Sequence, residues 1–262
     1  MAHVLQYKIA DLHITLRSDI AMTNNASWEK FLCSAAQSDY TYECHMYPHL
    51  PMLPNGKHYH DQIHGRDYAI TEEFDHGMRI HLSEENLPWG SEVDQLYPQL
   101  ALPHVLLQHQ KLLLHASYII TERGAILFTA PSGTGKSTQA ELWKVHRNAF
   151  IVNGDRAVIG LQGENVNAYG FPLSGSSPDC HNRTKKLLAI VSLEQAKQNS
   201  VRRLRLTEAL PVFINGSYLP PEYQADLSNI VDTAVQIAKC VPIIELSCLP
   251  DEGAVAALES IL

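Results

Sequence analysis

The feature that most constrains the fold of this chain is a glycine-rich stretch near its middle, "APSGTGKST", from Ala130 to Thr138. It approaches the pattern G-x-x-x-x-G-K-[ST], a loop that joins a strand to a helix. The run "AILFT" before it is almost entirely apolar, as expected of a central strand covered on both faces. The run "STQAELWKVH" after it contains helix-forming residues and no breaker. The sequence therefore predicts a sheet with helices packed against it.

The residue types of this loop are suited to holding phosphate. Glycines let the backbone turn its N–H groups inward, and the following helix N-terminus adds its dipole. Lys136 is expected to meet the outer phosphates of a nucleotide, and the Ser137 hydroxyl is placed to bind Mg²⁺. Ala130 replaces the first glycine, which is tolerated if its φ is negative. The predicted phosphate-binding residues are Ser132, Gly133, Thr134, Gly135, Lys136, Ser137 and Thr138.

The composition limits the partners that such a loop could serve. Of 262 residues, 45% are hydrophobic and 18% charged, so the chain can bury a core. A formal net charge of -8 argues against nucleic acid or an anionic membrane as a partner, because both favour a basic surface. Scattered cysteines, no signal-peptide pattern and no apolar run of membrane-spanning length are typical of a reduced, cytoplasmic protein. A homo-oligomer stays open.

Two domains are predicted, a β-rich N-terminal unit over residues 1–90 and a second domain over residues 91–262 that carries the loop. In the first, "VLQYKIADLHITLR" is strand material with a turn near Ala10-Asp11. The run "DYAITEEFDHGMRIHLS" is predicted to be two strands joined at Asp75-His76-Gly77.

The run "PHLPMLPNGKHYHDQIHG" between these strands is predicted to be irregular because turn-forming residues crowd it. It holds His58, His60 and His64, whose spacing resembles that of metal ligands. A zinc site would need a helix there or a fourth ligand, so the loop reading disfavours a metal.

Strand and helix patterns alternate beyond the loop. The run "KKLLAIVSL" is predicted to be a strand that ends in a short helix, and "VPIIELSC" is predicted to be a strand. The runs "TEALPVFINGSY", "QADLSNIVDTAVQIAKC" and "DEGAVAALESIL" are predicted helices, the last capped by Asp251. This mixture predicts an α/β nucleotide-binding core.

A hairpin before the loop is predicted to bring His115 to the mouth of that loop. Two apolar runs flank the connection T-E-R-G at 121–124, which is typical of a hairpin. If its central pair forms the turn, His115 faces Ala130; if its glycine forms a bulge, His115 faces Pro131. A lone histidine is often a core residue, but its pairing position favours a functional role.

Phosphate transfer also needs an acid, and Asp155 is the candidate. In "FIVNGDRAVI" it follows an apolar run, where an acid at the end of a core strand would stand. Such a carboxylate could hold metal or take the proton of an acceptor hydroxyl. The alternative is an ordinary turn aspartate, since N-G-D is also turn chemistry. His115, Asp155 and Lys136 are the predicted catalytic residues, and Ser137 and Asp155 the predicted metal ligands.

The runs "LLHASYIITERGAILFTAPSGTGKSTQAELW" and "NAFIVNGDRAVI" resemble the kinase domain of the HPr kinase/phosphorylase family. That family places a histidine, a short hairpin, the phosphate loop and an Asp-bearing strand in this order. The resemblance covers residues 105–262 and implies a P-loop core of the HPr kinase/phosphoenolpyruvate carboxykinase type, with ATP and Mg²⁺ as cofactors. It also implies that His115 is the active-site histidine and that Asp155 deprotonates an acceptor serine.

The sequence departs from the family at Gly154, where HPr kinases usually carry the first of two adjacent acids. Closer look-alikes are small HPr-kinase-like proteins encoded with ribosomal peptides, including lasso-peptide kinases that phosphorylate a C-terminal serine of a precursor. The runs "GFPLSGSS" and "LAIVSLEQAKQNSVRRL" are similar to that group. The resemblance therefore implies an ATP-dependent serine kinase acting on a peptide or small protein.

Two other functions stay open, a non-catalytic nucleotide-binding module that regulates a partner, and a kinase of small-molecule hydroxyls. Arg183 could clamp a phosphate or a peptide carboxylate, or could belong to a solvated basic turn. Arg202, Arg203 and Arg205 are more typical of a solvated, salt-bridged face.

Overall fold

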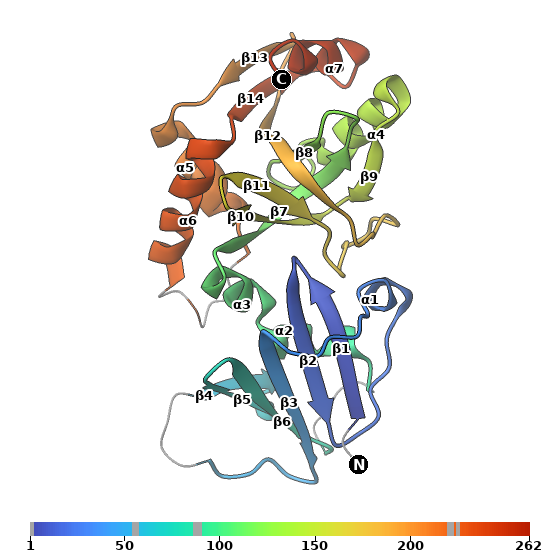
Figure 1. Cartoon of the computed structure of the whole chain (residues 1–262), viewed down its shortest axis with the longest axis vertical. Helices are drawn as coiled ribbons and strands as arrows, with labels where there is room; N and C mark the ends of the chain where they lie inside the picture. Colours follow the sequence, from blue (N-terminus) through green and yellow to red (C-terminus); the bar gives the residue numbers. More distant parts are fainter. Residues whose placement is uncertain (1–2, 54–57, 86–90, 219–222, 224–225) are drawn as a thin grey trace. The chain divides into compact units, whose positions relative to one another are not determined.

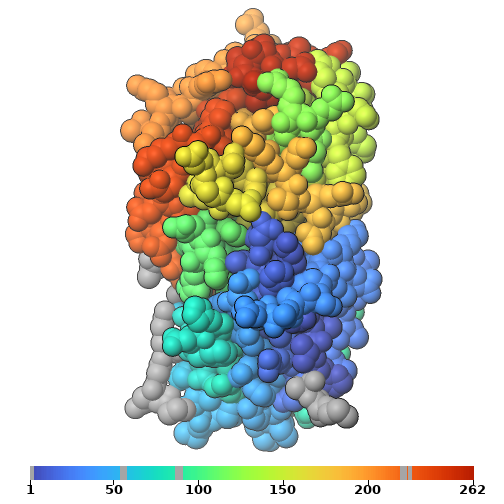
Figure 2. Space-filling view, viewed as in Figure 1, coloured from blue at the N-terminus to red at the C-terminus, as the bar shows by residue number. Residues whose placement is uncertain are grey.

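A computed structural model describes residues 3–53, 58–85, 91–218, 223 and 226–262, which are drawn in colour (Figure 1 and Figure 2). The chain divides into two compact units, Met1–Leu102 and Pro103–Leu262. Each unit has its own sheet, so the protein is a mixed α/β protein with two sheets. The sequence-based domain division after residue 90 stays a prediction. No helix in the described ranges combines the length and apolar character needed to cross a membrane.

The first unit is built on a six-stranded sheet with the order β1-β2-β3-β6-β5-β4. The predicted turn at Ala10-Asp11 is confirmed, because both residues have positive φ, 49° and 66°, between β1 and β2. The turn predicted near His76 is also confirmed, between β5 and β6. The elements are β1 (His3–Ile9), β2 (Leu12–Ser18), α1 (Ala26–Glu29), β3 (Tyr40–Tyr47), β4 (His58–Ile63), β5 (Arg66–Phe74), β6 (Gly77–Ser83), η1 (Val93–Leu96) and α2 (Tyr97–Leu100).

The irregular stretch predicted before residue 66 is wrong at its end, where β4 pairs with β5 in antiparallel register. The hairpin closes at His64 and Gly65, whose φ values of 49° and 75° suit a tight turn. His60 therefore lies on a strand, and its Nδ1 is 2.8 Å from an oxygen of Asp67. Within the described residues, no three histidine, cysteine or acidic side chains form a metal-binding group. Residues 48–53 of that stretch form no helix or strand, as predicted, and residues 54–57 lie outside the described residues.

The second unit contains an eight-stranded sheet with the order β11-β10-β7-β8-β12-β14-β13, and β9 also pairs with β7. Strand β12 runs parallel to both β8 and β14, whereas β7 is antiparallel to β8, β9 and β10. The strands are β7 (Lys111–Ile120), β8 (Ala125–Thr129), β9 (Phe150–Asn153), β10 (Arg156–Gln162), β11 (Asn165–Tyr169), β12 (Thr184–Gln195), β13 (Ser200–Arg203) and β14 (Ile243–Cys248). The helices are α3 (Leu102–Gln108), α4 (Lys136–Arg147), α5 (Leu206–Gly216), α6 (Leu227–Cys240) and α7 (Glu252–Glu259).

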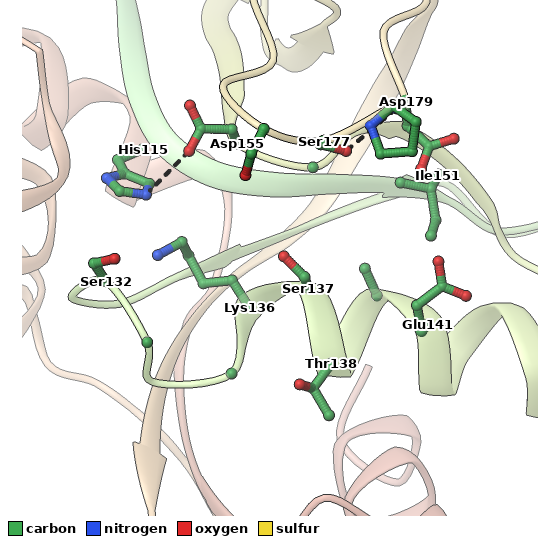
Figure 3. Close-up of a pocket in the computed structure, with 16 residues that line it drawn as sticks. His115, Ser132, Lys136, Ser137, Thr138, Glu141, Ile151, Asp155, Ser177 and Asp179 are labelled. Carbon is green, nitrogen blue, oxygen red and sulfur yellow. Dashed lines mark hydrogen bonds and ion pairs between the residues drawn. The ribbon is translucent and has the colours of Figure 1, made fainter.

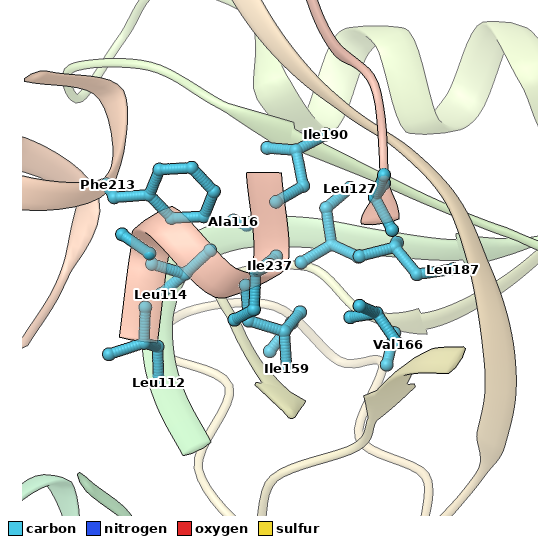
Figure 4. Packing of buried hydrophobic residues seen from close by; sticks show 14 of the residues in the cluster. Leu112, Leu114, Ala116, Leu127, Ile159, Val166, Leu187, Ile190, Phe213 and Ile237 are labelled. Carbon is cyan, nitrogen blue, oxygen red and sulfur yellow. The ribbon is translucent and has the colours of Figure 1, made fainter. Parts of the chain in front are cut away.

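Helices cover both faces of this sheet and explain why β8 is apolar at every position but its last. Leu127 packs with Phe213 of α5 and Ile237 of α6 in one core cluster (Figure 4). Its neighbours Ile126 and Phe128 belong to a second cluster, which includes side chains of α4 and α7. Because successive strand residues point to opposite faces, a strand between two cores needs apolar residues throughout. The prediction of a central, doubly covered strand is confirmed.

The predicted helices after the loop are confirmed, and the Asp251 carboxylate caps α7 by accepting a hydrogen bond of 3.1 Å from the Ala254 amide. The short helix predicted at the end of "KKLLAIVSL" is wrong. Strand β12 continues through Gln195, because β14 pairs with it as far as that residue and satisfies its backbone groups, whereas its pairing with β8 ends at Ser192. Strand β14 matches its prediction.

Candidate active site

The hairpin of β7 and β8 adopts the first of the two predicted registers. Ala116 pairs with Thr129 and Ile120 with Ala125. The Thr121 and Gly124 backbones exchange hydrogen bonds of 2.8 and 3.3 Å around a two-residue turn. One step beyond the last pair, His115 stands opposite the first residue of the glycine-rich loop. The Thr129 hydroxyl donates to the His115 carbonyl at 3.0 Å, which holds the two strand ends together.

The glycine-rich loop has the backbone that its sequence predicts. Gly133 and Gly135 have φ values of 78° and 122°, and a Cβ at either would meet nothing within 4 Å. These positions therefore need glycine for its conformational freedom rather than for space. Ala130 is not among the described residues with positive φ, so alanine replaces the usual glycine without strain. Helix α4 begins at Lys136, with Gly135 as its N-cap.

Lys136 is a buried cation whose hydrogen bonds, among the described residues, all go to backbone carbonyls. Its Nζ donates to the carbonyls of Ala130 at 2.9 Å and Pro131 at 3.3 Å. Burial lowers the pKa of this ammonium, and the charge of Asp155 partly opposes that effect. In the described part of the chain, Nζ is within ion-pair distance of no carboxylate. A buried ammonium without a counter-ion favours the binding of an anion.

A cavity of about 500 Å³ brings the loop together with the predicted histidine and acid (Figure 3). Of the predicted site residues, Thr134 alone does not line it. Thr134 instead lines a neighbouring cavity of about 420 Å³ that shares Gly133, Gly135 and Thr138 with the first. The residues lining the first cavity are His115, Ser132, Gly133, Gly135, Lys136, Ser137, Thr138, Ala140, Glu141, Ile151, Gly154, Asp155, Ser176, Ser177, Pro178 and Asp179.

Asp155 lies between β9 and β10, and each of its carboxylate oxygens faces a nitrogen donor. Oδ1 is 3.3 Å from Nε2 of His115, and Oδ2 is 3.3 Å from Nε of Arg156. Burial lowers the pKa of His115, as do the nearby charges of Lys136 and Arg156, against the opposing charge of Asp155. The lowered pKa favours the neutral imidazole, and this weakens its contact with Asp155 as an ion pair.

Arg156 and His115 both pack against Tyr218, which the sequence did not single out. The Arg156 guanidinium lies 4.9 Å from the centre of the Tyr218 ring. The His115 ring stacks on the same ring with centroids 5.9 Å apart and planes 18° apart. Burial raises the pKa of Tyr218. The tyrosine comes from the segment after α5, so no local pattern links it to the residues it supports.

Asn153 organises the turn that carries Asp155, and it was also missed. Its side chain is fully buried, and its Oδ1 accepts from the amides of Asp155 at 3.0 Å and Arg156 at 2.8 Å. Its Nδ2 donates to the carbonyls of Phe171 and Leu173, both at 3.0 Å. A signal was present in "NGD", because an asparagine side chain often accepts from amides two and three residues later. The contacts with 171 and 173 have no such local signal.

The structure explains why residue 154 is glycine rather than an acid. A Cβ at Gly154 would stand 2.2 Å from Oγ and 2.6 Å from Cβ of Ser177. Ser177 belongs to the turn after β11 and lines the same cavity. Its hydroxyl accepts a hydrogen bond of 3.2 Å from the Asp179 amide, which keeps it there. The place of a second acidic side chain is thus taken by a serine.

The arginines that the sequence analysis considered, Arg183 and the group from 202 to 205, do not line this cavity. Arg183 is exposed and stacks over Phe150 at 5.9 Å, and it does not line the cavity. Arg202 bonds Glu245 through two nitrogens, at 2.7 and 3.0 Å, and Glu208 at 2.9 Å. The predicted solvated, salt-bridged face is confirmed for Arg202 and Arg205, whereas the exposed Arg203 donates to the Ile261 carbonyl at 3.1 Å.

Of the comparisons with known proteins, only the one with solved structures found a similarity. No family model matches this chain, and no curated protein matches its sequence. Among solved structures, the chain is similar to the Hpr(Ser) kinase/phosphatase from Coxiella burnetii, with a TM-score of 0.36 and 9% sequence identity. That similarity covers 57% of this chain and 95% of the other. It is too low to assign a family, a fold type or an activity to this chain.

Proposed function

We propose that this protein is an ATP- and Mg²⁺-dependent kinase that transfers phosphate to a serine hydroxyl of a peptide or small protein. The observation that carries the proposal is the pairing of two groups across one cavity. Lys136 supplies a buried cation at the start of α4 that no carboxylate of the described residues reaches within ion-pair distance, and Asp155 supplies a carboxylate. A loop that only binds phosphate has no need of the second group.

The residues present fit a nucleotide. The loop offers the free amides of the α4 N-terminus, with the exposed hydroxyls of Ser137 and Thr138 beside them. The neighbouring cavity is lined by apolar Leu193 and Pro250 together with the amide side chains of Gln139 and Gln195. An apolar slot with a few polar groups suits a nucleobase. We therefore place the phosphates on the loop and the base in this neighbouring cavity.

The residues also fit a metal-assisted transfer. Ser137 and Asp155 are the oxygen donors that would hold Mg²⁺, which would supply charge neutralisation for the phosphates. Asp155 would accept the proton of the acceptor serine. His115, neutral and in contact with the Asp155 carboxylate, would orient that carboxylate rather than compete for the proton. Arg156 and Lys136 would stabilise negative charge on the transferred group.

The proposed acceptor is a serine hydroxyl of a peptide. Its support is the sequence resemblance to HPr-kinase-like proteins encoded with ribosomal peptides. We take the C-terminal serine of a lasso-peptide precursor as the first acceptor to test.

The test compares nucleotide binding with phosphate transfer in matched variants. Lys136→Ala should abolish ATP binding measured by calorimetry, whereas Lys144→Ala, an exposed position on the same helix, should not. Asp155→Asn should keep ATP binding but lose transfer to serine peptides, measured by mass spectrometry. Asp232→Asn, an exposed position on α6, is the control for charge removal.

Three outcomes would redirect the proposal. Full transfer by Lys136→Ala would place the reaction elsewhere. ATP binding by the native chain without transfer to any acceptor would favour a regulatory nucleotide-binding module. Transfer to small hydroxyl compounds alone would favour a small-molecule kinase.

A further inference from the structure

A tight turn after β11 approaches the proposed catalytic carboxylate and places a serine in the wall of the same cavity. The Ser177 amide donates to the Ser174 carbonyl at 3.0 Å, and the Ser174 hydroxyl donates to the Ser177 carbonyl at 2.8 Å. Gly175, with φ of 57°, and Ser176 form the tip between them. The turn is thus closed by two internal hydrogen bonds and has a defined shape.

The tip of this turn lies against Asp155. A Cβ on Gly175 would be 2.8 Å from Oδ2 and 2.9 Å from the carboxyl carbon of Asp155. A side chain at 175 would therefore collide with the carboxylate, and glycine allows the turn to approach it. The next residue, Ser176, lines the same cavity as Lys136 and Ser137.

Ser176 differs from its neighbouring serines in having a hydroxyl available for reaction. The Ser174 hydroxyl donates within the turn, and the Ser177 hydroxyl accepts from the Asp179 amide. Ser176 is exposed, and no hydrogen bond of its hydroxyl is found in the described part of the chain. An acceptor hydroxyl needs this arrangement: freedom from competing bonds, a carboxylate nearby and a phosphate loop in the same cavity.

We propose that Ser176 is an internal phosphate acceptor, modified by the same chain that carries it. This inference rests on the proposed kinase function. The Ser176 oxygen forms a bond to the γ-phosphorus of ATP as the bond from that phosphorus to the ADP oxygen breaks. ADP leaves with the electron pair of the broken bond, and the hydroxyl proton passes to Asp155. Lys136 and Arg156 are the nearby cations that would hold the resulting phosphoserine.

The experiment incubates the full chain with ATP and Mg²⁺ in the absence of any other acceptor, and then maps phosphate by peptide mass spectrometry. We expect phosphate on Ser176 in the native chain and its loss in Ser176→Ala. The control Ser200→Ala, at an exposed position on β13, should keep it. Urea unfolding of Ser176→Ala should match the native chain, because this hydroxyl makes no bond that stabilises the fold.

A mixing experiment tests whether the transfer is internal. Lys136→Ala chains, which keep Ser176, are incubated with Ser176→Ala chains, which keep the catalytic residues. We expect no phosphate on the Lys136→Ala chains, and phosphate there would overturn the internal route. The labelled fraction of native chains should also rise at a rate that does not depend on chain concentration.

The failure of this inference is separable from the failure of the proposed function. Transfer to a peptide with Ser176 unmodified would overturn the inference and leave the kinase function standing. Phosphate found on Ser177 or Ser132 instead would overturn it as well. Absence of transfer to Ser176 and to every added acceptor would overturn both.

Discussion

Asn153→Ala should be among the most disruptive single substitutions around the candidate site. The change removes four hydrogen bonds at once, two to carbonyls of the segment after β11 and two from the amides of Asp155 and Arg156, where β10 begins. The side chain is fully buried, so water cannot replace it without rearrangement. The substitution would therefore release both the turn that carries Asp155 and the segment that leads to Ser177.

The size of the effect follows from these bonds. Each internal hydrogen bond contributes about 1 kcal/mol net, and a buried group left unpaired costs more. The Phe171 carbonyl still accepts a hydrogen bond from the Cys180 thiol at 3.3 Å, so losing the bond from Asn153 to this carbonyl costs less than losing the others. The amides of Asp155 and Arg156 are only partly buried and regain some hydration. We expect a loss of about 2–4 kcal/mol in the free energy of unfolding.

Urea unfolding followed by circular dichroism measures this loss, with an unchanged slope showing that the unfolding reaction is the same. Asn167→Ala is the matched control. The Asn167 side chain lies on β11 and makes one exposed hydrogen bond to Gln162. Its loss should stay within about 0.5 kcal/mol. If Asn153→Ala unfolds as late in urea as Asn167→Ala, Asn153 does not organise this turn and the reasoning is refuted.

Two further predictions concern the same site. Gly154→Asp should lower the free energy of unfolding by about 1–3 kcal/mol, because the new Cβ would stand 2.2 Å from the Ser177 hydroxyl oxygen. Adding Ser177→Gly should restore most of the lost stability. Equal losses in the single and double variants would refute the clash. His115→Gln should flatten the dependence of stability on pH. Burial lowers the pKa of His115 in the folded chain, so the unfolded chain binds the imidazole proton more readily. The native chain therefore loses stability as pH falls below about 6.5 and toward the folded-state pKa. The variant lacks this contribution. Urea midpoints measured on either side of that range test this, and an unchanged difference between native chain and variant would contradict it.

The local parts of the site could be predicted from sequence because short-range physics decides them. Glycines at 133 and 135 are needed for positive φ, and an apolar run before them is needed between two cores. A two-residue connection leaves few registers, so the place of His115 opposite Ala130 was one of two choices. Asp155 follows a short strand in the same way.

The errors share a physical cause, which is pairing between segments distant in sequence. The run before residue 66 has turn-forming composition, yet its end becomes β4 because β5 offers a partner. The end of β12 continues as a strand because β14 pairs with it through Gln195. Such pairings add hydrogen bonds that local propensity cannot anticipate.

The sequence by itself determined a glycine-rich loop between a strand and a helix, with a histidine and an acid close by. Each of these depends on residues a few positions apart, whose backbone preferences act locally. The tertiary structure alone decided how the acid is held: Asn153 ties its turn to residues 171 and 173, Tyr218 supports His115 and Arg156, and Ser177 excludes a side chain at 154. Those contacts join segments that the sheet brings together, and only a packed fold places them at bonding distance.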